Sequence, residues 1–147
     1  MITLIEALNY RCLRYVRQPL TPFHVLVGPH ASGKTTFLDV VGFLARLLSD
    51  GVAEAVEERT LNFKDLVWNR EGQAFELAIE LDIPQDLQNG LPRGYTQIRY
   101  EVRVGIHADT SCPRKATRSR NAVLPLAFGP TRAWKGQSGC RMYRRHR

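Results

Sequence analysis

Short apolar runs and alternating apolar and polar residues predict several strands in the part of the chain before residue 105. Residues 2–8 form a short apolar run with one glutamate, which favours a first strand. The run Phe23–Val27 is rich in β-forming side chains and stops at Gly28, so we expect a buried strand there. Residues 75–82 and 98–104 both alternate, and the turn residues between them favour an antiparallel hairpin.

In that hairpin the charged residues fall on one face. We expect Glu76 and Glu80 to face water, with Arg99, Glu101 and Arg103 at the neighbouring outward positions. Strand residues alternate between faces, so the intervening apolar side chains should point into a core. These carboxylates are therefore interpreted as solvated charges rather than as catalytic bases.

A second pattern predicts helix. Apolar residues recur at positions 37, 40, 41, 44 and 48, which is the spacing of one helix face, and further apolar residues widen that stripe. We therefore expect a largely buried helix over residues 35–48, stopped by Gly51. Residues 52–59, rich in alanine and glutamate, favour a second, short helix.

Charge divides the chain into two parts. Residues 1–110 carry 11 Lys/Arg and all 14 Asp/Glu, a net charge of −3. Residues 111–147 carry 10 Lys/Arg and no acid, a net charge of +10. Such a break in composition indicates a boundary. We predict a folded domain over 1–110 and a basic tail over 111–147 that is irregular or disordered, because it shows no periodicity.

Composition also narrows the setting in which the protein acts. No run of 18 apolar residues occurs, so the sequence predicts no transmembrane helix and no membrane partner. The first residues lack the basic and apolar regions of a signal peptide. Three widely spaced cysteines, without a CxxC pair, are typical of a reduced, cytoplasmic protein.

One motif carries recognisable chemistry. Gly28-Pro29-His30-Ala31-Ser32-Gly33-Lys34-Thr35 matches G-x-x-x-x-G-K-[ST], the P-loop or Walker A pattern. Its glycines let backbone N–H groups curl around phosphates, its lysine reaches the β- and γ-phosphates, and its hydroxyl is a Mg²⁺ ligand. The motif lies between a predicted strand and a predicted helix. The sequence therefore predicts a nucleoside triphosphate site, most simply for ATP and Mg²⁺, with Thr35 on the metal and Thr36 as a weaker contact.

The surrounding sequence resembles a known family. Residues 25–40, with Leu-Asp after the P-loop, are similar to the start of the ABC-type ATPase heads of the SMC/RecF/OLD group, often described as AAA-family ATPases. Leu8-Asn9-Tyr10-Arg11 resembles the group's N-F/Y-[KR] segment, which implies Arg11 as a nucleotide contact. The resemblance covers roughly residues 1–107. It implies an α/β P-loop NTPase lobe in which a mixed sheet packs on the P-loop helix, with an antiparallel β-subdomain beside it.

This chain departs from the family pattern. His30 replaces the usual Asn, but the loop holds phosphate chiefly through its backbone, so binding should survive. The family's Walker B, four apolar residues followed by Asp-Glu, does not occur. The nearest candidates are residues 78–82, interrupted by Glu80, and residues 37–39, inside the P-loop helix. The Leu-Ser-Gly-Gly-like signature does not occur either. We therefore expect an apparently truncated N-terminal lobe that binds ATP, whose hydrolysis by this chain alone is doubtful and whose catalytic residues are undefined. A homodimer or a complementing C-terminal fragment are possible partners.

The sequence leaves other functions open. The alternative is a basic nucleic-acid-binding module with a vestigial nucleotide site, because Lys and Arg lie near Trp134 and Tyr143 in the tail. A GTPase is disfavoured because the chain has no Asn-Lys-x-Asp motif. A small P-loop kinase would require an arginine-rich lid, for which residues 114–120 are a candidate, but residues 2–11 fit the ABC-type head better.

Overall fold

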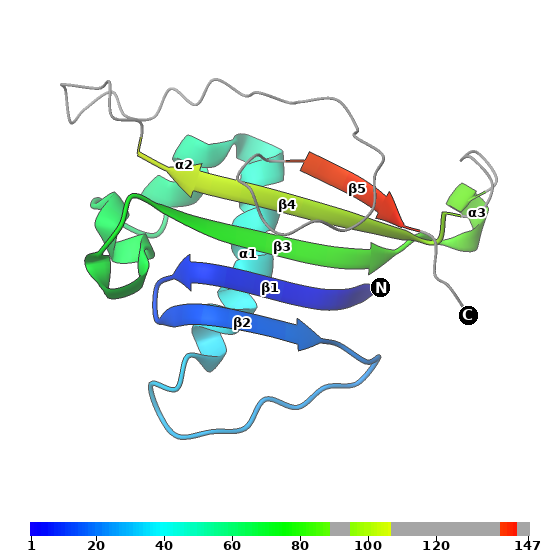
Figure 1. Cartoon of the computed structure of the whole chain (residues 1–147), viewed down its shortest axis with the longest axis horizontal. Coiled ribbons are helices and arrows are strands. Elements are labelled where there is room, and N and C mark those ends of the chain that lie inside the picture. Colours follow the sequence, from blue (N-terminus) through cyan, green and yellow to red (C-terminus); the bar gives the residue numbers. More distant parts are fainter. Residues whose placement is uncertain (89–94, 107–138, 144–147) are drawn as a thin grey trace.

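The computed structural model describes residues 1–88, 95–106 and 139–143. Five strands form one sheet in the order β2-β1-β3-β4-β5, with β1 (Ile2–Tyr10) and β3 (Ala74–Asp82) near its centre (Figure 1). The other strands are β2 (Leu13–Pro19), β4 (Gln97–Gly105) and β5 (Gly139–Tyr143). All four strand pairings are antiparallel.

The antiparallel pairing corrects one expectation about the fold. The described strands form no mixed sheet, and no separate antiparallel subdomain stands beside them. The predicted hairpin is confirmed: β3 pairs with β4 in a register that places Glu80 opposite Arg99 and Glu76 opposite Arg103. The first strand is also confirmed, and it continues to Tyr10. The antiparallel sheet is thus itself the platform on which the helix packs.

The sequence patterns gave no sign of β2. It follows β1 through a two-residue turn, Arg11-Cys12, because Tyr10 and Leu13 are paired across it. Asn9 and Arg11 take left-handed backbone angles, with φ of 56° and 51°. Left-handed residues reverse the chain tightly. A buried residue, Leu13, opens β2, but most of its other side chains are exposed, so its apolar signal is weak.

Both predicted helices are confirmed. The helix α1 (Lys34–Asp50) crosses one face of the sheet, and α2 (Val52–Glu57) follows it directly after Gly51 (Figure 1). The buried face of α1 comprises Phe37, Val40, Phe43 and Leu44, which all lie in the predicted apolar stripe. Leu38 and Leu48 are 60% and 64% exposed, so the helix is less buried than expected. Short helical turns connect the remaining elements: η1 (Phe63–Leu66), η2 (Trp68–Arg70) and α3 (Gln85–Gln88).

An aromatic cluster joins the helix to the sheet. Tyr10, Phe43 and Phe75 come from β1, α1 and β3, and all three are fully buried. Their ring centroids lie 4.9–5.8 Å apart in tilted or edge-on arrangements, which are favourable for aromatic rings. This cluster fixes the position of α1, and with it the end of the P-loop, against the sheet.

The predicted buried strand Phe23–Val27 is wrong. This segment forms no strand in the structure, and Phe23, Val25 and Val27 are 82%, 60% and 85% exposed. Leu26 alone packs partly against the core. The segment has the residues of a strand, but no described strand lies beside it to accept its backbone hydrogen bonds.

The polar face of the sheet is also more buried than expected. The expectation that Glu76 and Glu80 face water is wrong, because their side chains are only 14% and 25% exposed. Arg99 is 7% exposed and Glu6 is 4% exposed, so these charges are buried too. Arg99 donates hydrogen bonds to Glu6, Glu80 and Glu101. Arg103, at 53% side-chain exposure, does face water, 3.7 Å from Glu76. Buried charges require such pairing, because an unpaired charge in the interior is very unfavourable.

The basic tail lies mostly outside the described residues. Within it, Gly139–Tyr143 forms β5, which pairs with β4, so this part of the tail is a strand rather than irregular. The division into a domain over 1–110 and a tail over 111–147 stays a prediction.

Candidate functional site

The loop Gly28–Gly33 connects the exposed segment before it to the start of α1. Gly33 is the N-terminal cap of α1 and has a left-handed φ of 88°, which glycine adopts without strain. Ala31 also has a positive φ, 61°. At Gly28 an added Cβ would lie 2.9 Å from the Ser32 hydroxyl oxygen. The loop therefore curls tightly on itself, as the spacing of its two glycines predicts.

Lys34 directs its ammonium group back into this loop. Its Nζ donates to the carbonyl oxygens of Gly28 and Pro29, at 2.8 and 2.6 Å, and lies 3.2 Å from the Ser32 hydroxyl. All three acceptors belong to the loop itself. The positive charge is thus held over the loop, where phosphate oxygens are strong alternative acceptors for an ammonium group.

The start of α1 suits a negative charge. Among the described residues, no side chain caps the helix at Gly33, and its first turn holds no acidic residue. The N–H groups of a first turn have no partner within the helix, and the helix dipole makes this end positive. Thr35 is exposed and Thr36 is partly buried, so the Thr35 hydroxyl is open to a metal ion.

The turn between β1 and β2 lies against the P-loop. A Cβ added to Gly33 would lie 3.1 Å from Cys12 Sγ and 3.3 Å from a Leu13 methyl carbon. Cys12 Sγ is also 3.3 Å from the Thr36 hydroxyl oxygen. A side chain at position 33 would therefore be strained by the left-handed backbone angle, and it would also have to displace the Cys12 or Leu13 side chain slightly. The neighbour of Cys12, Arg11, is consequently brought to the same end of α1.

One carboxylate connects this turn to α1. Asp39 Oδ2 accepts a hydrogen bond of 2.5 Å from the Tyr10 hydroxyl and lies 3.3 Å from Arg11 NH1. Its Oδ1 lies 2.9 Å from Arg59. Burial by itself raises the pKa of Asp39, but the hydrogen bonds from Arg59 and Tyr10 outweigh it and hold the pKa below its usual range. Asp39 is therefore ionised at neutral pH.

The structure thus brings together the residues that the sequence singled out. Gly28 to Thr36 form one loop and the first helical turn, and Arg11 lies beside them through Cys12 and Asp39. Sequence reasoning missed Cys12 and Arg59, and it considered Asp39 only within the family's Leu-Asp pattern and as part of a Walker B candidate. A signal existed for Asp39, which is an acidic residue within an otherwise apolar helical stripe, four positions after Thr35.

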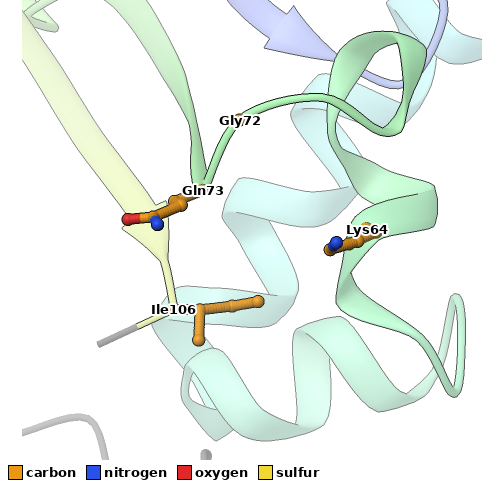
Figure 2. A pocket seen from close by; sticks show the side chains of 4 residues that line it. All are labelled: Lys64, Gly72, Gln73 and Ile106. Carbon is orange, nitrogen blue, oxygen red and sulfur yellow. The ribbon is translucent and has the colours of Figure 1, made fainter. Parts of the chain in front are cut away.

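A hollow elsewhere on the described surface does not belong to this site. Its volume is about 400 Å³, and Figure 2 shows the four residues that line it: Lys64, Gly72, Gln73 and Ile106. None of them belongs to the P-loop, and Lys64 is the one charged residue of the four. Within residues 1–88 and 95–106, no group of three His, Cys, Asp or Glu side chains could hold a metal ion. In the same part of the chain, no helix has the length and apolar character to span a membrane.

Comparison with known proteins identifies the fold. No protein-family model matches the chain, and no curated protein matches it. A solved structure is similar to this chain, with a TM-score of 0.54 and 22% identity. It is described under the heading of structural biochemistry of ATP-driven dimerization and DNA-stimulated activation of SMC ATPases. The alignment covers 71% of this chain and 63% of that one. The chain therefore has an SMC-like ATPase fold and spans less than two thirds of the length of the SMC ATPase chain.

Proposed function

We propose that this chain binds ATP with Mg²⁺ at the loop Gly28–Thr36, as the N-terminal lobe of an ABC-type, SMC/RecF-like ATPase. One observation carries the proposal: the P-loop motif opens α1 through left-handed Gly33, with the Lys34 ammonium folded over the loop. The SMC-like fold supports the same function. The cysteine pattern supports a cytoplasmic setting.

Each part of the loop has a distinct role in this proposal. The backbone around Pro29, His30 and Ala31 surrounds the phosphates, and the first-turn N–H groups of α1 add to it. Lys34 neutralises charge on the β- and γ-phosphates, and Thr35 holds Mg²⁺, which supplies further neutralisation when bound. Arg11 contributes a second cation from the β1–β2 turn. His30 in place of Asn leaves the backbone contacts intact.

The decisive experiment compares Lys34→Ala with Lys64→Ala by calorimetric titration of ATP·Mg²⁺. Loss of the P-loop ammonium leaves phosphate charge unmatched, so Lys34→Ala should weaken binding by at least about tenfold, the effect of one charged hydrogen bond. Lys64 lies in η1, outside the loop, so Lys64→Ala should bind as the wild type does. Equal affinities for wild type and Lys34→Ala would refute the proposed function.

A partner that completes the lobe forms part of the proposal. The SMC ATPases of the similar structure are described as dimerising in an ATP-driven manner and as activated by DNA. Here Phe23, Val25 and Val27 expose apolar side chains on a segment with strand-forming residues that leads directly into the P-loop. A strand from a complementing C-terminal fragment, or from a second copy of this chain, would cover them. The basic tail, residues 111–147, is the candidate segment for binding nucleic acid, and that part of the proposal rests on the charge of the tail alone.

A further inference from the structure

Four side chains from three parts of the chain meet at Asp39 of α1, the helix that the P-loop opens. Tyr10 and Arg11 come from the end of β1 and its turn, Asp39 from α1, and Arg59 from the segment after α2. Asp39 contacts all three of the others. We call this group the Asp39 cluster. Its members were not part of the P-loop motif, yet they tie the β1–β2 turn to the helix that the motif opens.

The contacts in the cluster are not equivalent. Arg59 donates through Nε to Asp39 Oδ1 and is 12% exposed, and the Tyr10 hydroxyl is fixed within the aromatic core. Arg11 instead touches Asp39 through one nitrogen at 3.3 Å, and its side chain is 41% exposed. Arg59 and Tyr10 therefore hold the carboxylate in place, whereas Arg11 is held by it at the surface.

The position of Asp39 on α1 determines where this places the Arg11 guanidinium. Residues three and four apart on a helix are neighbours on one face, so Asp39 lies on the same face of α1 as Thr35 and Thr36, one turn further along the helix. One helical turn is about 5.4 Å. The contact of Cys12 Sγ with the Thr36 hydroxyl, at 3.3 Å, brings the Arg11-Cys12 turn to the same helix end from the sheet side. The Arg11 charge, in contact with Asp39, consequently lies within about one helical turn of the first turn of α1.

We propose that Asp39 is a positioning residue for the nucleotide: it holds the Arg11 guanidinium near the first turn of α1, where that charge joins Lys34 in attracting phosphate. The inference rests on the proposed function, because it requires a phosphate ligand at the P-loop. Asp39 itself does not touch the ligand. Its negative charge is already matched by Arg59, so it directs Arg11 without repelling the phosphates.

A double-mutant cycle on ATP·Mg²⁺ affinity tests this role. Arg11→Ala should weaken binding by about tenfold, the effect of one charged contact. Asp39→Asn keeps the shape of the side chain but loses the charge that orients Arg11, so a similar loss is expected. The double variant should be no weaker than the weaker single variant, because residue 39 acts only through residue 11. Arg11→Lys should recover part of the affinity.

The same helix offers a matched control. Arg46 and Asp50 form an exposed ion pair of 2.8 Å at its far end, so Arg46→Ala and Asp50→Asn should leave ATP affinity unchanged. Thermal melts identify variants that remain folded. If Asp39→Asn is unfolded, Asp39→Glu takes its place in the cycle. Glu retains the charge that Arg59 requires but moves it by one methylene, and a loss of affinity should again vanish in the Arg11→Ala background.

The outcomes separate this proposal from the proposed function. Suppose that wild type binds ATP and Lys34→Ala does not, but that the fold-loss of affinity in the Asp39/Arg11 double variant equals the product of the two single losses. Asp39 then does not act through Arg11, and the positioning role is overturned. Tighter binding by Asp39→Asn would also overturn it, since the carboxylate would then compete with phosphate for Arg11. If wild type shows no binding that depends on Lys34, the proposed function itself has failed, and the positioning role fails with it.

Discussion

Arg99 is the most heavily paired charge that the structure describes. It lies on β4 with 7% exposure, and Glu6, Glu80 and Glu101 surround it from three strands. Burial lowers the pKa of an arginine, but the hydrogen bonds that Arg99 donates to these carboxylates outweigh burial and raise the pKa of Arg99, which stays charged. The face of the sheet opposite α1 is therefore held together by charge pairs, whereas the α1 side is apolar.

Removal of Arg99 should be strongly destabilising. Arg99→Ala leaves Glu6 buried at 4% exposure without its cation, and breaking a buried pair in this way costs about 3–5 kcal/mol. Arg103→Ala is the matched control on the same strand and face. Arg103 is 53% exposed, and its ion pair with Glu76 is long, at 3.7 Å. This substitution should cost less than about 1 kcal/mol. Urea unfolding of both variants measures the difference, and similar losses for the two would contradict it.

At the scale of elements, α1 and the segment Phe23–Val27 behave in opposite ways. Both are rich in apolar residues, but the helix has a sheet to pack on, and the segment has no described strand as a neighbour. Phe43 is fully buried among Tyr10 and Phe75, whereas Phe23 is 82% exposed. The contribution of a phenylalanine to stability follows from this difference in burial and not from its sequence pattern.

Two phenylalanine variants measure this contrast. Phe43→Ala should lose about 3–5 kcal/mol of the free energy of unfolding, because it leaves a cavity between helix and sheet. Phe23→Ala should change it by less than about 0.5 kcal/mol, as exposed substitutions usually do. Chemical denaturation of the isolated chain gives both values. A large loss for Phe23→Ala would mean that the segment is buried, as the sequence alone predicts.

At the scale of the whole molecule, the positions of the carboxylates bear on ATP turnover. Asp82, one of the two sequence candidates for a Walker B residue, ends β3, and its N–H bonds to the Met1 carbonyl beside the start of β1. The Arg11-Cys12 turn beside the P-loop lies at the other end of β1, nine residues away along the strand. At about 3.3 Å per residue, roughly 30 Å separates them. The other candidate, Asp39, is engaged by Arg59, Arg11 and Tyr10.

We therefore expect the chain alone to hydrolyse ATP very slowly. Transfer of the γ-phosphate to water requires a group that orients the water, and neither sequence candidate is free to do so at the P-loop. Steady-state phosphate release by purified protein provides the measurement, with Lys34→Ala as the control for contaminating ATPases. Turnover of about 1 s⁻¹ or faster that disappears in Lys34→Ala would reveal a catalytic carboxylate outside these two. Addition of a complementing fragment should raise the rate.

The sequence by itself determined the local elements and the chemistry of one loop. Helical spacing is set by side chains within a few residues of each other, so α1 and its buried face were predictable. An apolar run likewise predicted β1, and alternation predicted the β3–β4 hairpin, but the register that sets Glu80 opposite Arg99 came from the structure. The P-loop was predictable because glycine spacing, a lysine and a hydroxyl are all local requirements. The identity of its ligand stays a prediction.

Only the tertiary structure decided which residues are buried and which distant ones meet. Whether Phe23–Val27 is covered depends on a neighbouring strand, which no local pattern encodes, and whether Arg99 faces water depends on Glu6, which is distant in sequence. The contact between Arg11 and Asp39 requires the left-handed turn after β1 and the packing of α1 on the sheet. Burial and long-range pairing depend on the whole fold, so the sequence predicted the loop but not the cluster that surrounds it.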